Sequence, residues 1–157
     1  MLQQENLETR LKQLGVSLPV APKPLGAYTP AVTVGTLLFI SGMVPIVDGK
    51  PYSTGRLGLE RSVEDGQIAS RIAALNGLAV AKAELGTLDR IKRVVRLNVI
   101  QFATPEFADH AKVADGASDL FGHLFGPGNS HARLVQGAAS LPGGYSVVLE
   151  IIFEIIP

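Results

Sequence analysis

The sequence predicts an α+β fold in which two helices cover one face of a mixed β-sheet. Apolar residues recur at helical spacing in two long segments and alternate with polar residues in the segments between them. After a short N-terminal helix, the elements follow in the order ββαβαββ, which is typical of an α+β sandwich. Hydrophobic residues make up 46% of the 157 residues, enough for one core. We therefore expect one domain over residues 1–157, with an N-terminal helix and linker in 1–24 and the core in 25–157.

The N-terminal segment predicts a helix followed by an extended linker. Leu7, Leu11 and Leu14 have helical spacing, and Gly15 is placed to end the helix. Three prolines in residues 19–24 cannot continue a helix, so this stretch should connect the helix to the core.

A hairpin and a long loop should come next. Two β-rich runs, residues 31–34 and 36–40, are separated by a turn at Gly35, which is a hairpin signal. The loop from about residue 44 to residue 60 is rich in glycine and long for a compact domain. We expect it to make few buried contacts, to be mobile, and to border a pocket where it selects ligands by size.

The middle of the chain predicts a helix and then a strand. Ser62 is a suitable N-cap, and Gly86 is placed to end the helix. Its buried face is expected to hold Ile68, Ile72, Leu75 and Ala79. Residues 91–102 should form a strand, because apolar residues there alternate with arginine and asparagine.

The last third predicts a second helix and two further strands. Thr104-Pro105-Glu106 combines a cap, a proline and an acid, as a helix start does, and Gly126 should end this helix. Its buried face is expected to hold Phe107, Ala111, Ala114, Ala117, Phe121 and Leu124. Strands are expected at 132–139 and 145–155. One face of the last strand is apolar throughout and the other largely so, and we expect a second subunit to cover it.

Composition and charge exclude several classes of function. Basic and acidic residues balance at 14 each, so the net positive field typical of nucleic-acid binding is missing. The sequence has no cysteine, which excludes disulfides and thiolate metal sites. His110, His123 and His131 lack metal-ligand spacing and no dinucleotide, Walker or serine-hydrolase motif occurs, so we expect neither metal nor cofactor. Without a signal peptide or a membrane-length apolar run, we expect a cytoplasmic protein that makes no membrane contact.

Two segments carry chemical information. The first is LGAYTP at residues 25–30, where Tyr28 precedes Ser41 of FISGMVP by 13 positions. The second begins with His131-Ala132-Arg133 and opens a strand that runs to Leu141-Pro142. Arginine binds carboxylates through two parallel hydrogen bonds, so Arg133 is a candidate carboxylate ligand. The competing interpretation is an ordinary surface arginine.

In this order, the segments resemble the RidA/YjgF family, also named endoribonuclease L-PSP or reactive intermediate deaminase. The resemblance rests on GxY…FxSGxxP, on the pair of central helices and on a late AR…LP hairpin, and it runs from about residue 25 to residue 155. The middle of the chain and the additional N-terminal helix resemble a subgroup with longer chains. The resemblance implies a chorismate-mutase-like fold and a homotrimer with a central β-barrel, in which pockets for small carboxylate ligands lie between subunits.

The resemblance also implies roles for particular residues. Arg133 would clamp the carboxylate of a 2-imino or 2-enamino acid, while main-chain groups of Val135 would contact its nitrogen or the attacking water. The rest of the substrate pocket would be formed by Tyr28, Ser41, Gly42 and Asp115, the last in place of a family asparagine. Hydrolysis would release a 2-keto acid and ammonia without a cofactor, since an iminium carbon is already electrophilic.

One departure from the family pattern bears on catalysis. Deaminating members place a water-orienting glutamate six residues after the proline of the LP pair, and here that position is Val148. Glu150 lies two residues further along the same strand face, so a two-residue shift of the hairpin would restore the carboxylate. Three functions follow: a carboxylate-binding pocket that hydrolyses imines with Arg133 and Glu150 as catalytic residues, a non-catalytic metabolite-binding trimer and, least favoured by the neutral charge, a ribonuclease.

Overall fold

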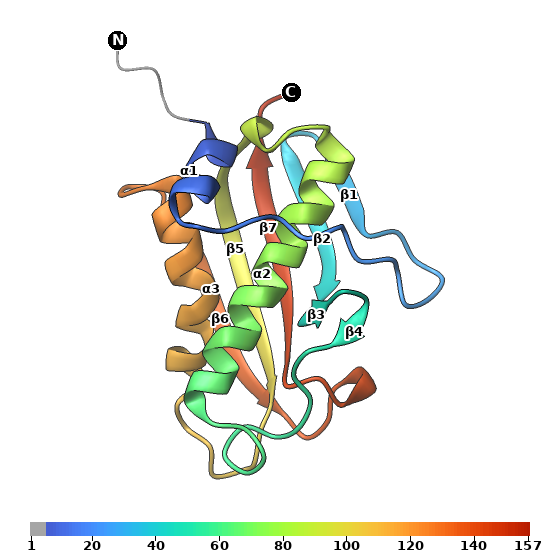
Figure 1. Ribbon diagram of the computed structural model, residues 1–157, viewed down its shortest axis with the longest axis vertical. Helices are drawn as coiled ribbons and strands as arrows, with labels where there is room; N and C mark the ends of the chain where they lie inside the picture. The colour runs from blue at the N-terminus through green and yellow to red at the C-terminus, as the bar shows by residue number, and fades with distance from the viewer. Residues whose placement is uncertain (1–5) are drawn as a thin grey trace.

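The structure, a computed structural model that describes residues 6–157, has a five-stranded mixed sheet at its centre with the strand order β1-β2-β7-β5-β6 (Figure 1). The strands are β1 (Ala31–Val34), β2 (Leu37–Met43), β5 (Ile91–Phe102), β6 (Ala132–Ala138) and β7 (Val147–Ile155). Neighbouring strands are antiparallel except for β5 and β6, which are parallel. The α+β fold expected from the sequence is confirmed, but the late hairpin is not, because β5 lies between β6 and β7.

Helices α2 (Val63–Leu85) and α3 (His110–Phe125) cover one face of this sheet (Figure 1). The predicted N-terminal helix is present as α1 (Leu7–Gln13), which packs beside α3 and the short 3₁₀ helix η1 (Leu88–Arg90). A second 3₁₀ turn, η2 (Pro142–Gly144), leads into β7. Residues 1–5 of the expected 1–24 segment lie outside the described residues. Within residues 6–157, no helix is long and apolar enough to cross a membrane.

Helix α2 begins where the sequence predicts but buries a different face. Ser62 accepts from the main-chain N–H of Asp65, and the Asp65 carboxylate accepts from that of Ser62, so the cap is reciprocal. Ile68, expected inside, is 47% exposed. The buried face instead consists largely of small residues, including Gly66, Ala69, Ser70, Ala73, Ala74 and Gly77. Small side chains allow the helix axis to approach its neighbours closely, and this close packing outweighs the larger apolar side chains.

Helix α3 starts later than predicted and packs unusually close to α2. It begins at His110, because the main-chain N–H of Thr104 is bonded to the carbonyl of Leu57 and the segment after it forms a turn. A Cβ added to Gly116 would lie only 2.0 Å from the main-chain oxygen of Gln67 on α2. Glycine at this position therefore sets the distance between the two helices. Ala111, expected on the buried face, is exposed.

The long loop before α2 is packed rather than loosely attached. It contains the small strands β3 (Ile46–Val47) and β4 (Lys50–Pro51), which pair with each other. Leu57 is fully buried, and its main-chain N–H donates to the carbonyl of Phe102 on β5. Ser53 is also buried and bonds to Ser146. The expectation of few buried contacts was wrong, because local glycine content does not reveal such long-range contacts.

The sheet face turned away from α2 and α3 has no helix over it within residues 6–157, and we call it the open face (Figure 1). On β7, odd-numbered residues from Val147 to Ile155 are buried beneath the helices, as predicted, whereas even-numbered residues point to the open face. Exposed apolar side chains on or beside the open face include Val32, Val34, Phe39 and Leu134. This apolar surface is consistent with a face that another subunit covers.

Candidate functional site

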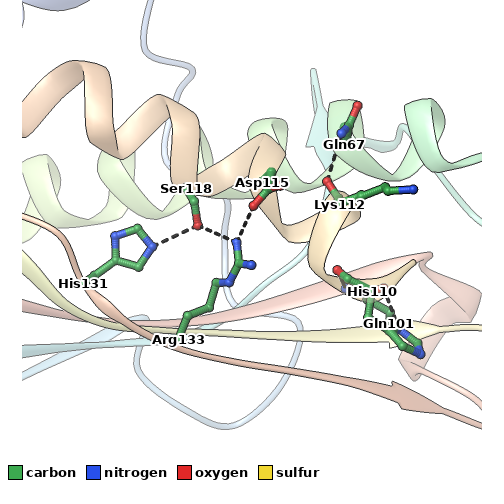
Figure 2. Close-up of polar contacts among 8 residues, drawn as sticks. All are labelled: Gln67, Gln101, His110, Lys112, Asp115, Ser118, His131 and Arg133. Carbon is green, nitrogen blue, oxygen red and sulfur yellow. Dashed lines mark hydrogen bonds and ion pairs between the residues drawn. The ribbon is translucent and has the colours of Figure 1, made fainter. Parts of the chain in front are cut away.

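Arg133 lies on β6, the last strand of the sheet, with its side chain on the helix side of the sheet edge (Figure 2). Its Nη1 donates to the Asp115 carboxylate at 2.7 Å and to the Ser118 hydroxyl at 3.1 Å. Asp115 and Ser118 are one turn apart on α3, so both face β6. Among residues 6–157, no hydrogen bond is made by Nε or Nη2 of Arg133. One side of the guanidinium is therefore fixed by α3, and two of its nitrogens stay available to a ligand.

Ser118 and His131, which the sequence reasoning did not select, extend this cluster. Ser118 Oγ accepts from Arg133, so its own hydrogen is directed to His131 Nε2, 2.9 Å away (Figure 2). This requires a neutral imidazole with its proton on Nδ1. Burial, and secondarily the positive charge of Arg133, lower the pKa of His131, which favours the same neutral form. The ring packs edge-on against Phe121, with centroids 6.0 Å apart.

Val135 lies on the edge strand β6, where main-chain polar groups can point away from the sheet without a partner. Its side chain packs against the core on the same sheet face as Arg133. The carbonyl of Ala138 accepts from the main-chain N–H of Ala103, the residue after β5, and main-chain groups of successive residues point to opposite sides of a strand. The N–H and C=O of Val135 therefore point to the free edge, where a sheet exposes unpaired polar groups. They are close enough along the strand to serve the same ligand as Arg133.

A second group of candidate residues lies at the start of the hairpin β1–β2. The Ser41 hydroxyl donates to the carbonyl of Thr29 at 2.6 Å, and its main-chain N–H donates to that of Pro30. The Tyr28 hydroxyl accepts from the main-chain N–H of Leu25 at 3.0 Å. This bond folds the Tyr28 side chain back onto the start of the LGAYTP segment. Tyr28 and Gly42 line one shallow hollow. The two parts of the first motif are thus brought together, and the side chain of Tyr28 remains 46% exposed.

Val148 lies against Gly42 in this second group. A Cβ added to Gly42 would be 3.1 Å from Cγ1 of Val148, so glycine makes room for the valine. Ile40 pairs with Ile151, and Met43 with Leu149, so Ser41 and Gly42 form a bulge opposite Glu150. Glu150 is exposed and directly opposite Asn98 on β5.

Glu150 and Arg133 do not meet within one chain. Asn98 is the neighbour of both Glu150 and Leu134, and its side chain points to the open face. Arg133 is one residue before Leu134, so its side chain points to the opposite face, beneath the helices. The sheet itself separates the two groups.

The candidate residues therefore form two half-sites at opposite edges of the sheet. Tyr28, Ser41, Gly42 and Val148 belong to the half-site on β1, β2 and β7. Arg133, Val135 and Asp115 belong to the half-site at the β6 edge, with strand β5 between the two. No group of three or more potential metal-ligating side chains occurs among residues 6–157. The cluster around Arg133 offers hydrogen-bond donors and a positive charge, which suit a carboxylate.

Residues 8–155 match the model of a family described as YjgF/chorismate-mutase-like, putative endoribonuclease. Protein TCP17 of Trypanosoma cruzi is 41% identical over 146 residues, which cover 92% of this chain and 91% of TCP17. The crystal structure of Atu1372 from Agrobacterium tumefaciens, a protein described as having unknown function, is similar with 41% identity and a TM-score of 0.88, covering 96% of this chain and 92% of that one. A putative endoribonuclease from Shewanella oneidensis is similar with 34% identity and a TM-score of 0.92, covering 96% of this chain and 100% of that one.

Proposed function

Because the chain belongs to the YjgF/chorismate-mutase-like family, we propose that it binds small carboxylate-bearing metabolites in clefts between the subunits of a homotrimer. The family membership confirms the resemblance drawn from the two sequence segments. The observation that carries the proposal is the hydrogen bonding of Arg133. Its Nη1 donates to Asp115 and Ser118, while Nε and Nη2 have no partner among the described residues. These two nitrogens form the side of a guanidinium that pairs with a carboxylate through parallel hydrogen bonds.

Because the two half-sites are apart within one chain, a complete cleft needs residues from two subunits. A cleft containing both Tyr28 and Arg133 requires the β6 edge of one subunit to face the β1–β2 edge of the next. Such head-to-tail contacts form a ring when the rotation from one subunit to the next divides evenly into a full turn. The apolar residues of the open face, Phe39 and Leu134 among them, would then be buried inside the ring. Three copies in the ring is the number that the family resemblance implies.

Within the cleft, each group has a separate task. Arg133 holds the carboxylate, and the free main-chain groups of Val135 bind a neighbouring polar atom of the ligand. The Asp115 carboxylate keeps the guanidinium from rotating and partly balances its charge. Tyr28, Ser41 and Gly42 of the adjacent subunit close the other side of the cleft.

Hydrolysis of a 2-imino acid is the second candidate function. In this reaction water adds to the imine carbon, the carbon–nitrogen bond breaks, and a 2-keto acid and ammonia leave. The side chain of Val148 brings methyl groups, not a carboxylate, against Gly42, so the position of the water-activating glutamate is apolar. Glu150, exposed opposite the Ser41–Gly42 bulge, is the carboxylate that favours the hydrolytic alternative. A general base typically contributes about 10²–10⁴-fold to a rate, so its placement separates binding from catalysis.

Titration calorimetry with 2-oxobutanoate tests the binding function. Arg133→Lys should weaken binding by about 1.5–3 kcal/mol, because an ammonium cannot reproduce the planar fork. The matched control is Arg71→Lys, the same exchange on α2 at a residue that belongs to neither half-site. Sedimentation of both variants at the same concentration checks that the assembly is unchanged. Equal affinity of wild type and Arg133→Lys for 2-oxobutanoate would refute the clamp.

A further inference from the structure

A cavity lies at the far end of β6, beyond the Arg133 cluster. Its volume is about 460 Å³, and its lining includes Arg56, Thr104, Phe107, His110 and residues 137–139. Cavities of this size accommodate small metabolites. No residue of the two half-sites lines this cavity, although it contains an imidazole and a guanidinium.

The imidazole of His110 is held in one orientation and one tautomer. Gln101, whose side chain is fully buried, donates from its amide nitrogen to the main-chain carbonyl of His110 at 2.9 Å. The amide oxygen of Gln101 therefore faces His110 Nδ1, also at 2.9 Å (Figure 2). An amide oxygen only accepts, so Nδ1 of the neutral ring carries the proton and Nε2 carries the lone pair. The buried Gln101 side chain thus donates one hydrogen bond to the main chain of His110 and accepts one from its ring, and the second bond fixes the tautomer.

The packing around His110 leaves Nε2 without a protein partner. Phe107 meets the ring edge-on, with centroids 5.1 Å apart. The Cε1–Nε2 edge lies over Gly137, where an added Cβ would be 3.0 Å from Cε1 and 3.4 Å from Nε2. Within residues 6–157 no hydrogen bond to Nε2 is made. Gly137 thereby makes room for a ring whose free nitrogen is an acceptor on the wall of the cavity.

Arg56 gives the same cavity a donor for anions. Its Nε and Nη2 bind the carboxylate of Glu60, at 3.4 and 3.2 Å, so the guanidinium is oriented by its own loop. Nη1 of Arg56 makes no hydrogen bond among the described residues. The cavity thus offers an unpaired imidazole acceptor, His110 Nε2, and a cationic donor, Arg56.

This cavity is separate from the Arg133 clamp. Gly137 lies four residues after Arg133 on β6, which corresponds to about 13 Å along a strand. On α3, His110 and Asp115 are five residues apart, about 7.5 Å along the helix axis. A ligand of a few carbon atoms held at Arg133 does not reach His110.

We propose that this cavity is a second ligand site, which takes a small hydroxy acid. The hydroxyl group of the ligand donates to His110 Nε2, and its carboxylate binds Arg56. Gln101 is a positioning residue for the imidazole, and Gly137 supplies the space that the ring occupies.

Nuclear magnetic resonance of protein labelled with ¹⁵N-histidine tests this proposal, with glycerate as the probe. In the free protein, long-range proton–nitrogen spectra should show His110 protonated at Nδ1 and unprotonated at Nε2. Glycerate should shift the Nε2 resonance saturably. Propionate, which keeps the carboxylate but lacks both hydroxyl groups of glycerate, should bind at least about tenfold more weakly, because it cannot donate a hydrogen bond to His110 Nε2. Gly137→Ala, which puts a methyl group against Cε1, should weaken glycerate binding by a similar factor.

Arg133→Lys separates this site from the proposed clamp. It should lose affinity for 2-oxobutanoate while keeping the His110 response to glycerate. An Nε2-protonated ring in the free protein, equal binding of glycerate and propionate, or loss of the glycerate response in Arg133→Lys would each overturn the second site. None of these results would affect the clamp, which the 2-oxobutanoate titration tests by itself.

Discussion

Replacing Gly116 with alanine should separate α2 and α3 and destabilise the protein. The added Cβ would lie 2.0 Å from the Gln67 main-chain oxygen, whereas ordinary contacts begin near 3.4 Å. One helix must therefore move by about 1.4 Å, or the alanine must distort α3. The obstacle is backbone, which cannot rotate away as a side chain can.

The magnitude follows from two opposing effects. Overpacking a close contact typically costs about 1–3 kcal/mol, and a backbone obstacle puts this site at the upper end. Alanine has a higher helix propensity than glycine by about 1 kcal/mol, which offsets part of that cost. We expect a net loss of about 2 kcal/mol in the free energy of unfolding.

Gly122 provides the matched control on the same helix. A Cβ there would meet nothing within 4 Å, so Gly122→Ala should stabilise the protein by about 0.5–1 kcal/mol through helix propensity alone. Urea unfolding followed by circular dichroism, at equal protein concentrations, measures both variants. If Gly116→Ala proved as stable as Gly122→Ala, the close approach of the helices would be refuted.

Three further predictions concern the cleft and the assembly. Val148→Glu should raise the rate of ammonia release from 2-iminopropanoate, generated in situ, by about 10²-fold or more, while Glu150→Gln should leave the native rate unchanged. Loss of the native rate in Glu150→Gln would instead assign the general base to Glu150. Phe39→Glu, which buries a charge inside the ring, should reduce the mass seen by light scattering to that of a monomer, and an unchanged mass would argue against burial of the open face. The pKa of His131 in the folded protein lies below its ordinary value of about 6.5, so the unfolded chain protonates this imidazole first as the pH falls. The free energy of unfolding should therefore decrease as the pH drops below about 6.5 and become constant below the lowered pKa. Melting temperatures of wild type and His131→Gln between pH 5 and 7.5 check this, and an equal pH dependence of the two would contradict it.

Much of the secondary structure follows from the sequence because it depends on local periodicity. The strand expected at residues 91–102 has those limits in the structure. The apolar face of β7 is buried as its alternation predicts. Ser62 caps α2 with Asp65, three residues further on, because a cap is made by residues close in sequence.

The tertiary structure alone decided which surfaces meet. Ile68 was expected to be buried but is exposed, and small residues of α2 are buried instead. The reason is that the contact of Gly116 with the backbone of Gln67 sets a short distance between α2 and α3. Leu57 ties a glycine-rich loop to β5 through hydrogen bonds that no local pattern reveals.

For the candidate site, the sequence identified residue types and the structure identified their partners. Arg133 was selected because arginine suits a carboxylate, but Ser118 and His131 join it only because α3 crosses β6 at that point. The separation of Tyr28 from Arg133 follows from the strand order, with β6 paired to β5 at one edge and β1 at the other. Strand order depends on contacts between distant segments, whereas periodicity reports only on neighbours in the chain. For this reason the sequence could specify the residues of both half-sites but not their placement at opposite edges of the sheet.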